Sequence, residues 1–276
     1  MFELPEYVVL SSQITQTLNK KKVLSASLGN SPHKFVWYNV SRGEFARIMA
    51  GKVVGPAYSR GRWMFIPMNP GHVLVFGECG GKILYHESMS SVPSKYHLLV
   101  RFVDGTALTA TTQMWGAMEL YKKGEELHRK YIEGMQPTPV DKEFTFKYFN
   151  GLVDQCLSTE TKTAKGLLTQ NQLIPGLGNS IAQDILFTAH VSPKRALREL
   201  QASDRRNLYN AIRRTVQEVI SKHGRYDEVD LFNQPGGYRR RMDKTSIGKP
   251  CPRCGGTVEK IQYLGGACYY CQECQS

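Results

Sequence analysis

The sequence lacks the features of a membrane or secreted protein. It contains no uninterrupted apolar run of about 18 residues, the length that a membrane-spanning helix needs. Its opening stretch, MFELPEYVVL, has no basic segment ahead of a long apolar one and so does not resemble a secretory signal peptide. Internal repeats and low-complexity tracts are also absent. We therefore expect no membrane partner and a cytosolic or nucleoid location.

Acidic residues are few compared with basic ones. The 276 residues include 24 Asp and Glu against 36 Lys and Arg, which gives a net charge of +12. An excess of positive charge attracts polyanions, because each neutralised phosphate releases condensed counterions. Charge alone fits either a nucleic-acid-binding protein or an ordinary basic protein. The length and the apolar fraction of 41% suit two domains of ordinary size.

The cysteines do not indicate a disulfide framework, because there are seven of them in a chain without a signal peptide. Five of the seven lie within residues 251–276, and four of these form two CxxC motifs separated by 16 residues. The four are Cys251, Cys254, Cys271 and Cys274. Two such motifs at this separation can place four thiolates around one tetrahedral ion, so we predict a single Zn²⁺ site.

Four cysteine ligands leave no open coordination position, so the predicted zinc is structural and not catalytic. A redox role for a CxxC motif is the alternative, but the surrounding sequence lacks the strand and helix pattern of a thioredoxin-like domain. The module is too short to bury much apolar surface, and we expect the metal to hold it folded. Cys268 is surplus to the four ligands and is either a small buried apolar residue or a reactive thiol.

The first half of the chain predicts a helix followed by a β-rich region. Pro5 suits the first turn of a helix over residues 3–18, in which apolar residues recur at helical spacing. Short β-prone runs, several of them separated by glycine-containing turns, follow at 34–38, 63–66, 73–76, 82–85, 98–102 and 107–111. We predict that residues 1–120 form a domain with an N-terminal helix and an antiparallel β-sandwich or barrel.

The second half predicts a linker, helices and an irregular tail. Residues 121–145 are charged and contain two prolines, and we assign them to a linker. Residues 146–230 form the predicted helical domain, and residues 231–276 form the predicted zinc module. The stretch 203–223 has a basic face that either is solvated or contacts phosphates. The predicted fold class is therefore α+β with several domains.

Two features of the second half are candidate anion-binding sites. The sequence PGLGN at residues 175–179 leads into a predicted helix, whose first turn presents free backbone N–H groups and the positive end of the helix dipole. Gly178 and Asn179 are a candidate clamp for one phosphate, although such a turn by itself is in most proteins only a helix cap. Further candidate phosphate contacts come from the run Arg239, Arg240 and Arg241.

Several motifs, in the same order along the chain, resemble those of the formamidopyrimidine-DNA glycosylase and endonuclease VIII family. The ELPE sequence at residues 3–6, the PGLGN turn, the PGGY and GKPC segments before the finger, and the four cysteines all match the family pattern. The resemblance extends over essentially the whole chain. It implies a helix–two-turn–helix domain, a C-terminal β-hairpin zinc finger, and a monomer that binds damaged or abasic duplex DNA.

The resemblance also implies the chemistry of base-excision repair. In the family, the damaged nucleotide is turned out of the duplex into a pocket, and an N-terminal amine, usually that of proline, attacks C1′ of the sugar. The resulting Schiff base releases the base and permits strand cleavage, while an adjacent glutamate transfers protons. Carried over to this sequence, the amine falls at Met1 or Phe2, and the glutamates are Glu3 and Glu6.

This sequence departs from the family pattern at the attacking group. Phe2 stands where the family has its N-terminal proline. A bulky second residue should prevent removal of Met1, so the free amine would belong to Met1, one residue farther from Glu3. A primary amine still forms an imine, so lyase activity is weakened but not forbidden. A lysine of the family's β-hairpin is replaced by Arg62, which keeps the charge for a phosphate but offers no neutral amine.

The residues that fill the gap left by the extruded nucleotide also depart from the family pattern. The family's intercalating methionine aligns with Glu78, which would repel phosphate. Its Arg-x-Phe wedge reads Gln113, Met114 and Trp115, of which Trp115 can still insert between base steps. The arginine at the tip of the family's finger falls on Gly266.

Three functions are compatible with this sequence. The first is an atypical DNA glycosylase with abasic-site lyase activity, acting in the cytoplasm in association with the nucleoid. The second is a catalytically inactive protein that binds damaged DNA or a DNA structure on the same scaffold. The third is an RNA-binding protein that uses the same basic surface. Borohydride trapping on abasic DNA separates the first from the second, and competition between DNA and RNA at fixed salt tests the third.

Overall fold

The chain folds into two compact units in the computed structural model, which describes residues 1–31, 34–159 and 162–275. The first unit consists of Met1–Met135 and Lys222–Gly237, and the second of Gln136–Ser221 and Tyr238–Ser276. The boundaries of these two units differ from the boundaries of the predicted domains. The segment predicted to end the helical domain at residue 230 packs in the first unit, whereas the cysteine module packs with the helices.

Helix α1 (Leu4–Leu18) confirms the predicted N-terminal helix, and a capping box closes its first turn. The Glu3 side chain accepts a hydrogen bond from the backbone N–H of Glu6, and the Glu6 carboxylate accepts one from the backbone N–H of Glu3 at 2.9 Å. These reciprocal bonds satisfy two backbone groups that the helix itself cannot pair. The buried face of α1 includes Tyr7, Leu10, Ile14 and Leu18.

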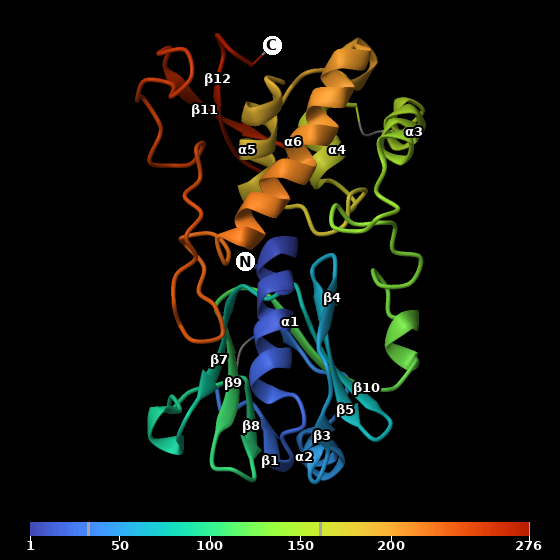
Figure 1. The fold of residues 1–276 in the computed structure, drawn as a ribbon, viewed down its shortest axis with the longest axis vertical. Helices are drawn as coiled ribbons and strands as arrows, with labels where there is room; N and C mark the ends of the chain where they lie inside the picture. The colour runs from blue at the N-terminus through green and yellow to red at the C-terminus, as the bar shows by residue number, and fades with distance from the viewer. Residues whose placement is uncertain (32–33, 160–161, 276) are drawn as a thin grey trace. The chain divides into compact units, whose positions relative to one another are not determined.

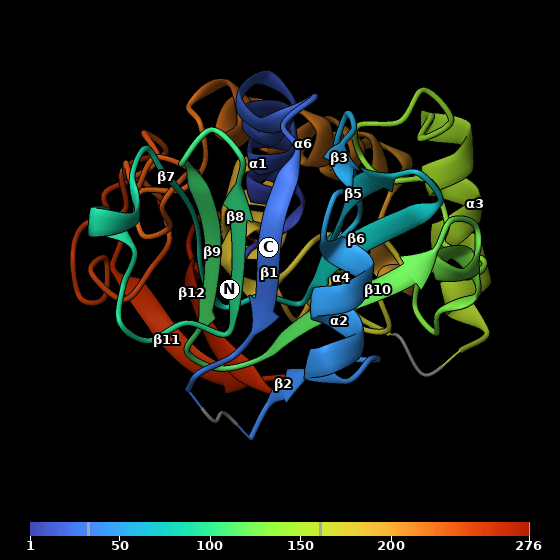
Figure 2. The same cartoon turned by 90° about the horizontal axis from the view of Figure 1, so that it is seen from below.

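Four strands form one antiparallel sheet of the first unit. In spatial order they are β1 (Val23–Leu28), β8 (Leu98–Phe102), β9 (Ala107–Thr112) and β7 (Gly81–His86). Figure 2 shows these strands side by side. Nearly every residue of the two central strands is buried, which explains why β8 is largely an apolar run and why the threonines of β9 alternate with buried apolar residues without forming an exposed face.

A second sheet of the first unit is antiparallel except at one edge. In spatial order it contains β2 (Val36–Trp37), β10 (Gly116–Lys122), β6 (His72–Gly77), β5 (Trp63–Asn69) and β3 (Val53–Val54), while β4 (Tyr58–Arg60) also pairs with β5. The exception is the short parallel pair β2–β10. One apolar core contains residues of both sheets and of α1, so the antiparallel sandwich is confirmed.

Helix α2 (Arg42–Met49) lies within the region that the sequence predicted to be β-rich. Ser41 caps it by accepting a hydrogen bond from the backbone N–H of Glu44 at 3.2 Å. Only Phe45 and Met49 of this helix are buried. One apolar pair four residues apart gives too little periodicity to reveal a helix in the sequence.

The returning segment, residues 222–237, contains no helix or strand but is fastened to the first unit along its length. Leu231 is fully buried in the core, and its carbonyl oxygen accepts a hydrogen bond from the backbone N–H of Tyr85 at 2.9 Å. Gln13 of α1 donates to Asp230 at 2.8 Å and accepts from the backbone N–H of Leu231 at 3.0 Å. The irregular character predicted for this region is confirmed.

The second unit is helical and ends in a β-hairpin, as Figure 1 shows. Its helices are α3 (Phe146–Leu157), α4 (Ala164–Thr169), α5 (Asn179–Ala189) and α6 (Ala202–Ser221), and its strands are β11 (Val258–Tyr263) and β12 (Gly266–Cys271). The turn between the strands has positive φ angles at Leu264 and Gly265, which suits the right-handed twist of a tight hairpin. None of the described helices is long and apolar enough to cross a bilayer.

Gly236 generates a stability prediction for the returning segment. A Cβ at this position would lie 2.2 Å from the backbone oxygen of Gly224, and a backbone atom cannot rotate away. Gly236→Ala should therefore lower the free energy of unfolding by about 1–3 kcal/mol, measured by urea denaturation. Gly43→Ala is the matched control, because its Cβ would meet no atom within 4 Å in α2 and the helix should gain slightly. Equal effects of the two substitutions would contradict this packing.

Candidate functional site

The first unit places the N-terminal amine beside a carboxylate. The α-amine nitrogen of Met1 lies 2.7 Å from Oε1 of Glu228, and the Met1 side chain is 35% exposed. Phe2, by contrast, is fully buried, and its backbone N–H donates to the carbonyl oxygen of Cys79 at 2.9 Å. Its ring packs edge-on against Tyr7. The accessible amine in this structure is therefore that of Met1, and Phe2 serves as a core residue.

Arg225 of the returning segment is the centre of a buried ionic cluster. Its side chain is only 1% exposed. Nε donates to Oε1 of Glu6 at 3.0 Å, and Nη2 donates to Oε2 of the same carboxylate at 3.0 Å. Nη2 also donates to the carbonyl oxygen of Met1 at 2.8 Å. The guanidinium lies 3.8 Å from Glu3 and 3.5 Å from Glu228.

The sequence did not single out Arg225 or Glu228 as site residues. A buried guanidinium is stable only when carboxylates and hydrogen bonds replace the water it has lost, and the planar fork of arginine meets both oxygens of one carboxylate. The predicted proton carriers Glu3 and Glu6 supply those partners. The ELPE motif gave a signal for the carboxylates, but Arg225 lies 219 residues beyond Glu6 in an irregular segment.

Three carboxylates face two cations in this cluster, which is defined by Met1, Glu3, Glu6, Arg225 and Glu228. Burial raises the pKa of Glu228 above its ordinary value, although Arg225 and the terminal amine oppose the shift. Burial alone would lower the pKa of Arg225, but the carboxylates of Glu6 and Glu3 outweigh it and raise that pKa. Glu228 is therefore a carboxylate that holds a proton more readily than an ordinary glutamate.

Arg62 and Glu78, which the sequence predicts to be departures from the family pattern, are ion-paired to each other. Nη1 of Arg62 lies 3.2 Å from Oε2 of Glu78, and the backbone N–H of Glu78 donates to the Arg62 carbonyl at 3.3 Å. Arg62 follows the tight turn at Gly61 between β4 and β5. Because Arg62 compensates the negative charge of Glu78, the repulsion expected between Glu78 and a phosphate is reduced.

The loop between β9 and β10 brings Gln113 and Trp115 to the surface near the N-terminus. Both side chains are exposed. The loop is held by hydrogen bonds from the Gln113 N–H to the Gly80 carbonyl at 2.7 Å and from the Gly80 N–H to the Trp115 carbonyl at 3.0 Å. A Cβ at Gly80 would lie 3.6 Å from Cα of Met1, so this loop borders the terminal residue.

In the second unit, the PGLGN turn ends at the start of α5, as predicted. Gly178 is the N-cap residue, and Asn179 is the first helical residue and is exposed. Gln172 braces the turn by accepting from the backbone N–H of Gly176 at 3.0 Å and donating to the Leu177 carbonyl at 3.2 Å. Gly176 has a φ of 95°, a backbone conformation that residues with a side chain rarely adopt.

The tip of the finger hairpin lies against Asn179. A Cβ at Gly266 would come within 3.0 Å of Nδ2 of Asn179, a contact that leaves little room for a side chain there. Lys165 of α4 is 1% exposed and donates from Nζ to the carbonyl oxygens of Tyr263 and Gly266. This buried lysine fixes the hairpin turn beside the first turn of α5, so the finger hairpin adjoins the candidate phosphate-binding turn within one unit.

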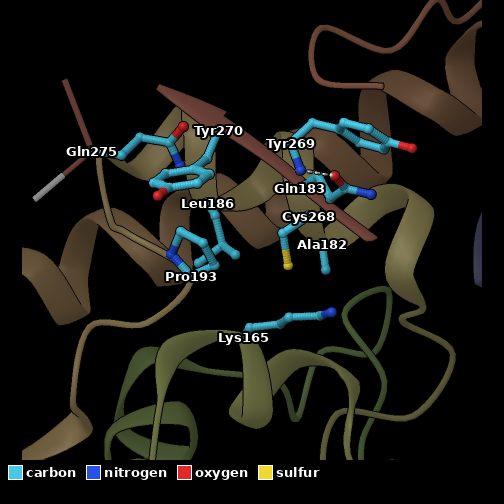
Figure 3. A pocket seen from close by; sticks show the side chains of 9 residues that line it. All are labelled: Lys165, Ala182, Gln183, Leu186, Pro193, Cys268, Tyr269, Tyr270 and Gln275. Atoms are coloured by element: carbon cyan, nitrogen blue, oxygen red, sulfur yellow. Dashed lines mark hydrogen bonds between the residues drawn. The ribbon is translucent and has the colours of Figure 1, made fainter. Parts of the chain in front are cut away.

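A small pocket lies between α4, α5 and β12, and Figure 3 shows Lys165, Gln183 and Cys268 among its lining residues. Oε1 of Gln183 accepts a hydrogen bond from the backbone N–H of Tyr269 at 2.7 Å, which ties the hairpin to α5. Cys268 is 2% exposed. Of the two interpretations left open by the sequence, burial supports a small apolar residue over a reactive thiol.

The arginine run is anchored by a buried carboxylate, Asp184 of α5. Asp184 accepts hydrogen bonds from the Tyr238 hydroxyl at 2.7 Å and from the backbone N–H of Arg241 at 2.9 Å. The Arg241 guanidinium is ion-paired with Glu218 at 3.1 Å. Arg240 lies 4.0 Å from Asp243. Arg239 is exposed, whereas Arg240 and Arg241 are half-buried.

The four predicted metal ligands lie together at one end of the hairpin. The Sγ atoms of Cys251, Cys254, Cys271 and Cys274 are all within 4.8 Å of one another. Two of the separations are 3.7 Å, between Cys251 and Cys274, and 3.4 Å, between Cys254 and Cys271. A tetrahedron with Zn–S bonds of about 2.3 Å has S–S edges of about 3.8 Å, so the donor set fits one such ion.

Comparison with known proteins identifies relatives for both units. A model of the formamidopyrimidine-DNA glycosylase N-terminal domain matches residues 1–118, and a model of the formamidopyrimidine-DNA glycosylase H2TH domain matches residues 135–228. The formamidopyrimidine-DNA glycosylase of Bacillus subtilis is 26% identical over 285 residues, covering 100% of this chain and 99% of that protein. The Bacillus cereus protein of the same name is 26% identical, covering 84% of each chain.

The fold also matches a solved structure along its length. The Lactococcus lactis Fpg, in a complex with DNA that contains an abasic site, superposes with a TM-score of 0.85 at 22% identity. The match covers 99% of each chain. The same two-part architecture, with sandwich, helices and hairpin, is therefore present in both proteins.

The ionic cluster generates a pH-dependent stability prediction. Arg225→Met leaves the buried carboxylates without their main counter-charge, and removing one partner of a buried pair typically costs about 3–5 kcal/mol. Burial already raises the pKa of Glu228, and without Arg225 the ionisation of Glu228 opposes folding, so the loss should grow as the pH rises from about 5 to about 8. Thermal denaturation across this range measures the effect.

Arg205→Met serves as the control for this prediction, because Arg205 pairs with Asp154, whose side chain is 54% exposed. An exposed pair of this kind contributes at most about 1 kcal/mol. A loss at Arg225 that is no larger than at Arg205, or that is largest in acid, would show that the cluster does not carry the ionised carboxylates described above.

Proposed function

Because the chain belongs to the formamidopyrimidine-DNA glycosylase family, we propose that it is a DNA glycosylase of base-excision repair that acts on damaged bases in duplex DNA. The observation that carries the proposal is the exposed α-amine of Met1 beside the carboxylate of Glu228. Phe2 stands where the resemblance places the family's proline. The proposed activity is therefore that of an atypical member, with abasic-site lyase activity through a primary amine.

In the proposed reaction, the nitrogen of Met1 attacks C1′ of the extruded nucleotide. The N–C1′ bond forms as the bond from C1′ to the damaged base breaks, and the base leaves with a proton. The C1′–O4′ bond of the sugar then breaks, O4′ takes the second proton of the nitrogen, and a C1′=N Schiff base results. Loss of a proton from C2′ then expels the phosphate at C3′, which cleaves the strand. A protonated amine cannot attack, so a nearby proton acceptor is required.

Glu228 is the proposed acceptor of that proton, in place of the predicted Glu3 and Glu6. Its Oε1 atom lies 2.7 Å from the amine, within reach for direct transfer. The raised pKa of Glu228 makes it a better base than an ordinary glutamate. Glu6, in contrast, uses both oxygens to hold Arg225.

Arg225 is a positioning residue in this proposal. It holds the Met1 carbonyl and contacts Glu228, so it fixes the amine and its proton acceptor relative to each other. Glu3 and Glu6 in turn neutralise Arg225 and cap α1. The role of the ELPE carboxylates is thus to build the site and not to transfer the proton.

We assign DNA contact to residues of both units. Asn179 at the first turn of α5 would hold one phosphate with its exposed side chain, with Gly178 as the buried N-cap residue before it, and Arg239 adds an exposed charge. In the first unit, Gln113 and Trp115 would occupy the space left by the extruded nucleotide. Arg62 would contact phosphate only if its ion pair with Glu78 opens. A DNA substrate places the protein with the chromosome, in the cytoplasm and associated with the nucleoid.

The metal proposed for the four-cysteine site is one structural Zn²⁺. The ligands are Cys251, Cys254, Cys271 and Cys274, whose sulfur separations fit a tetrahedron. With four protein ligands, the ion supplies folding energy and no catalytic step. It would keep the hairpin rigid, so that Lys165 can hold its tip beside Asn179.

A second function, binding of damaged DNA without cleavage, is favoured by two observations. Arg62 is ion-paired with Glu78, so its positive charge is already compensated within the protein. The terminal amine is primary and ion-paired. The amine must give up its ion-paired proton before it can attack the sugar, and Arg62 must leave Glu78 before it can contact a phosphate. The phosphate contacts proposed for the second unit depend on neither step, and the adduct experiment below separates the two functions.

Cys254→Ala should lower the zinc content from one ion per chain to none and weaken binding to duplex DNA. The hairpin depends on the metal because it buries little apolar surface of its own. Elemental analysis and fluorescence anisotropy measure the two effects. Cys268→Ala is the control, because Cys268 is buried on strand β12 of the same hairpin and is outside the ligand set. It should keep the full metal content, and a variant at Cys254 that did the same would refute the ligand assignment.

Borohydride reduction on abasic DNA tests the catalytic proposal. The wild type should form a covalent adduct that peptide mapping locates at the α-amine of Met1, after mass spectrometry of the intact protein has established its first residue. Glu228→Gln should slow adduct formation roughly a hundredfold or more, because the proton acceptor is lost. The wild-type rate should fall in acid as Glu228 becomes protonated, and this acidic limb should be absent from the variant.

Asp104→Asn is the matched control, because it removes a carboxylate from an exposed pair with Lys21 in the same unit. It should leave both the rate and the pH profile unchanged. Tight binding to abasic duplex with no adduct would support the non-cleaving function. An adduct at another residue would exclude the role of Met1.

A further inference from the structure

Three exposed aromatic side chains gather on one surface of the first unit. Trp37 and Trp115 stack with ring centroids 5.4 Å apart and an interplanar angle of 8°. Phe35 lies against Trp115 at 4.5 Å, tilted by 43°. The residues are 38%, 45% and 41% exposed for Phe35, Trp37 and Trp115. We call this group the aromatic platform.

The stability of the unit does not explain the platform. The third tryptophan of the chain, Trp63, is 2% exposed and lies beneath the guanidinium of Arg129 at 4.1 Å, as expected for a core indole. Trp37 and Trp115 instead leave close to half of their surface in water. Clustered exposed rings of this size are uncommon on a protein surface without a binding role.

The backbone fixes the platform in place. The parallel pair of β2 and β10 aligns Trp37 with Ala117, and the N–H of Gly116 donates to the Phe35 carbonyl at 3.1 Å. The Trp115 carbonyl accepts a hydrogen bond from the Thr112 hydroxyl at 2.6 Å. The unexpected parallel pair thus brings two segments that are distant in the sequence into one stack. A ligand would meet rings that are already ordered, which lowers the entropic cost of binding.

The platform adjoins the candidate active site. The Gly80 N–H is hydrogen-bonded to the Trp115 carbonyl, and a Cβ at Gly80 would lie 3.6 Å from Cα of Met1 and from Cβ of Met114. A positive charge also accompanies the rings, because Nζ of Lys34 lies 5.7 Å from the centre of the Phe35 ring. Flat apolar rings beside a cation match the chemistry of a nucleobase joined to a phosphate.

We propose that the aromatic platform binds an unpaired nucleobase of DNA by stacking. This assignment rests on the proposed function and extends the surface beyond Trp115 to Trp37 and Phe35, which supply most of its exposed area. In a fully paired duplex the faces of each base are covered by its neighbours. An unpaired base next to an abasic site or a gap is available to stack, so the platform confers a preference for such DNA over intact duplex.

Two oligonucleotide duplexes test this preference, one fully paired and one with an abasic site opposite a purine. Affinities are measured at one fixed salt concentration, since the phosphate contribution depends on salt. The wild type should bind the abasic duplex more tightly, and Trp37→Ala should reduce the ratio of the two affinities roughly fivefold or more. Phe35→Ala should act in the same direction. Trp37→Phe keeps a ring and should recover much of the ratio.

Tryptophan fluorescence gives a second measurement. Two of the three tryptophans belong to the platform, and the third is buried, so stacking of a base should quench the wild-type emission. The quenching should be stronger with abasic DNA than with paired DNA. Tyr131→Ala is the control, because Tyr131 is 64% exposed and is outside the platform. It should change neither the ratio nor the quenching, and circular dichroism of each variant verifies its folding.

The outcomes separate this proposal from the one on which it rests. If folded Trp37→Ala and Phe35→Ala keep the wild-type ratio and quenching while all proteins bind duplex, the platform proposal is overturned and the proposed function stands. Emission that changes with protein concentration but not with DNA would assign the platform to self-association and would also overturn it. Failure of the wild type to bind any duplex at low salt would remove both proposals.

Discussion

The first unit depends on the burial of one positive charge. Arg225 is almost completely withdrawn from water, and such a charge is tolerated only because Glu6 meets it with both oxygens while Glu3 and Glu228 lie nearby. The same guanidinium binds the Met1 carbonyl. The start of the chain, the first turn of α1 and the returning segment are therefore held by a single group, and the position of the terminal amine follows from it.

Replacements that look independent in the sequence are coupled in the structure. Arg62 and Glu78 each depart from the family pattern, and they form an ion pair with each other. A Cβ at Gly266, where the sequence predicts the position of the finger-tip arginine, would lie 3.0 Å from Nδ2 of Asn179, so a side chain there would require Asn179 to shift. The role of each of these residues is therefore interpreted together with that of its neighbour in the structure.

In both units, buried polar side chains anchor segments that are neither helix nor strand. In the second unit, Asp184 accepts bonds from Tyr238 and from backbone N–H groups near the arginine run, and Lys165 donates to carbonyl oxygens of the hairpin turn. In the first unit, Arg225 and Gln13 do the same for the returning segment. Such segments have no ladder or helix of their own, so side chains must satisfy their backbone groups. This explains why residues outside helices and strands carry so much of the candidate site.

The sequence by itself determined the family, the α+β class, the N-terminal helix, the sandwich, the helical stretch and the cysteine ligand set, because periodicity and short motifs are local signals. It did not reveal α2, whose buried residues are a single pair, or the parallel pairing of β2 with β10. Only the tertiary structure showed that Phe2 is buried, that Arg225 and Glu228 join the ELPE carboxylates, and that Trp37 stacks on Trp115. These are contacts between residues far apart along the chain, and no local pattern encodes which distant side chain will share a buried site.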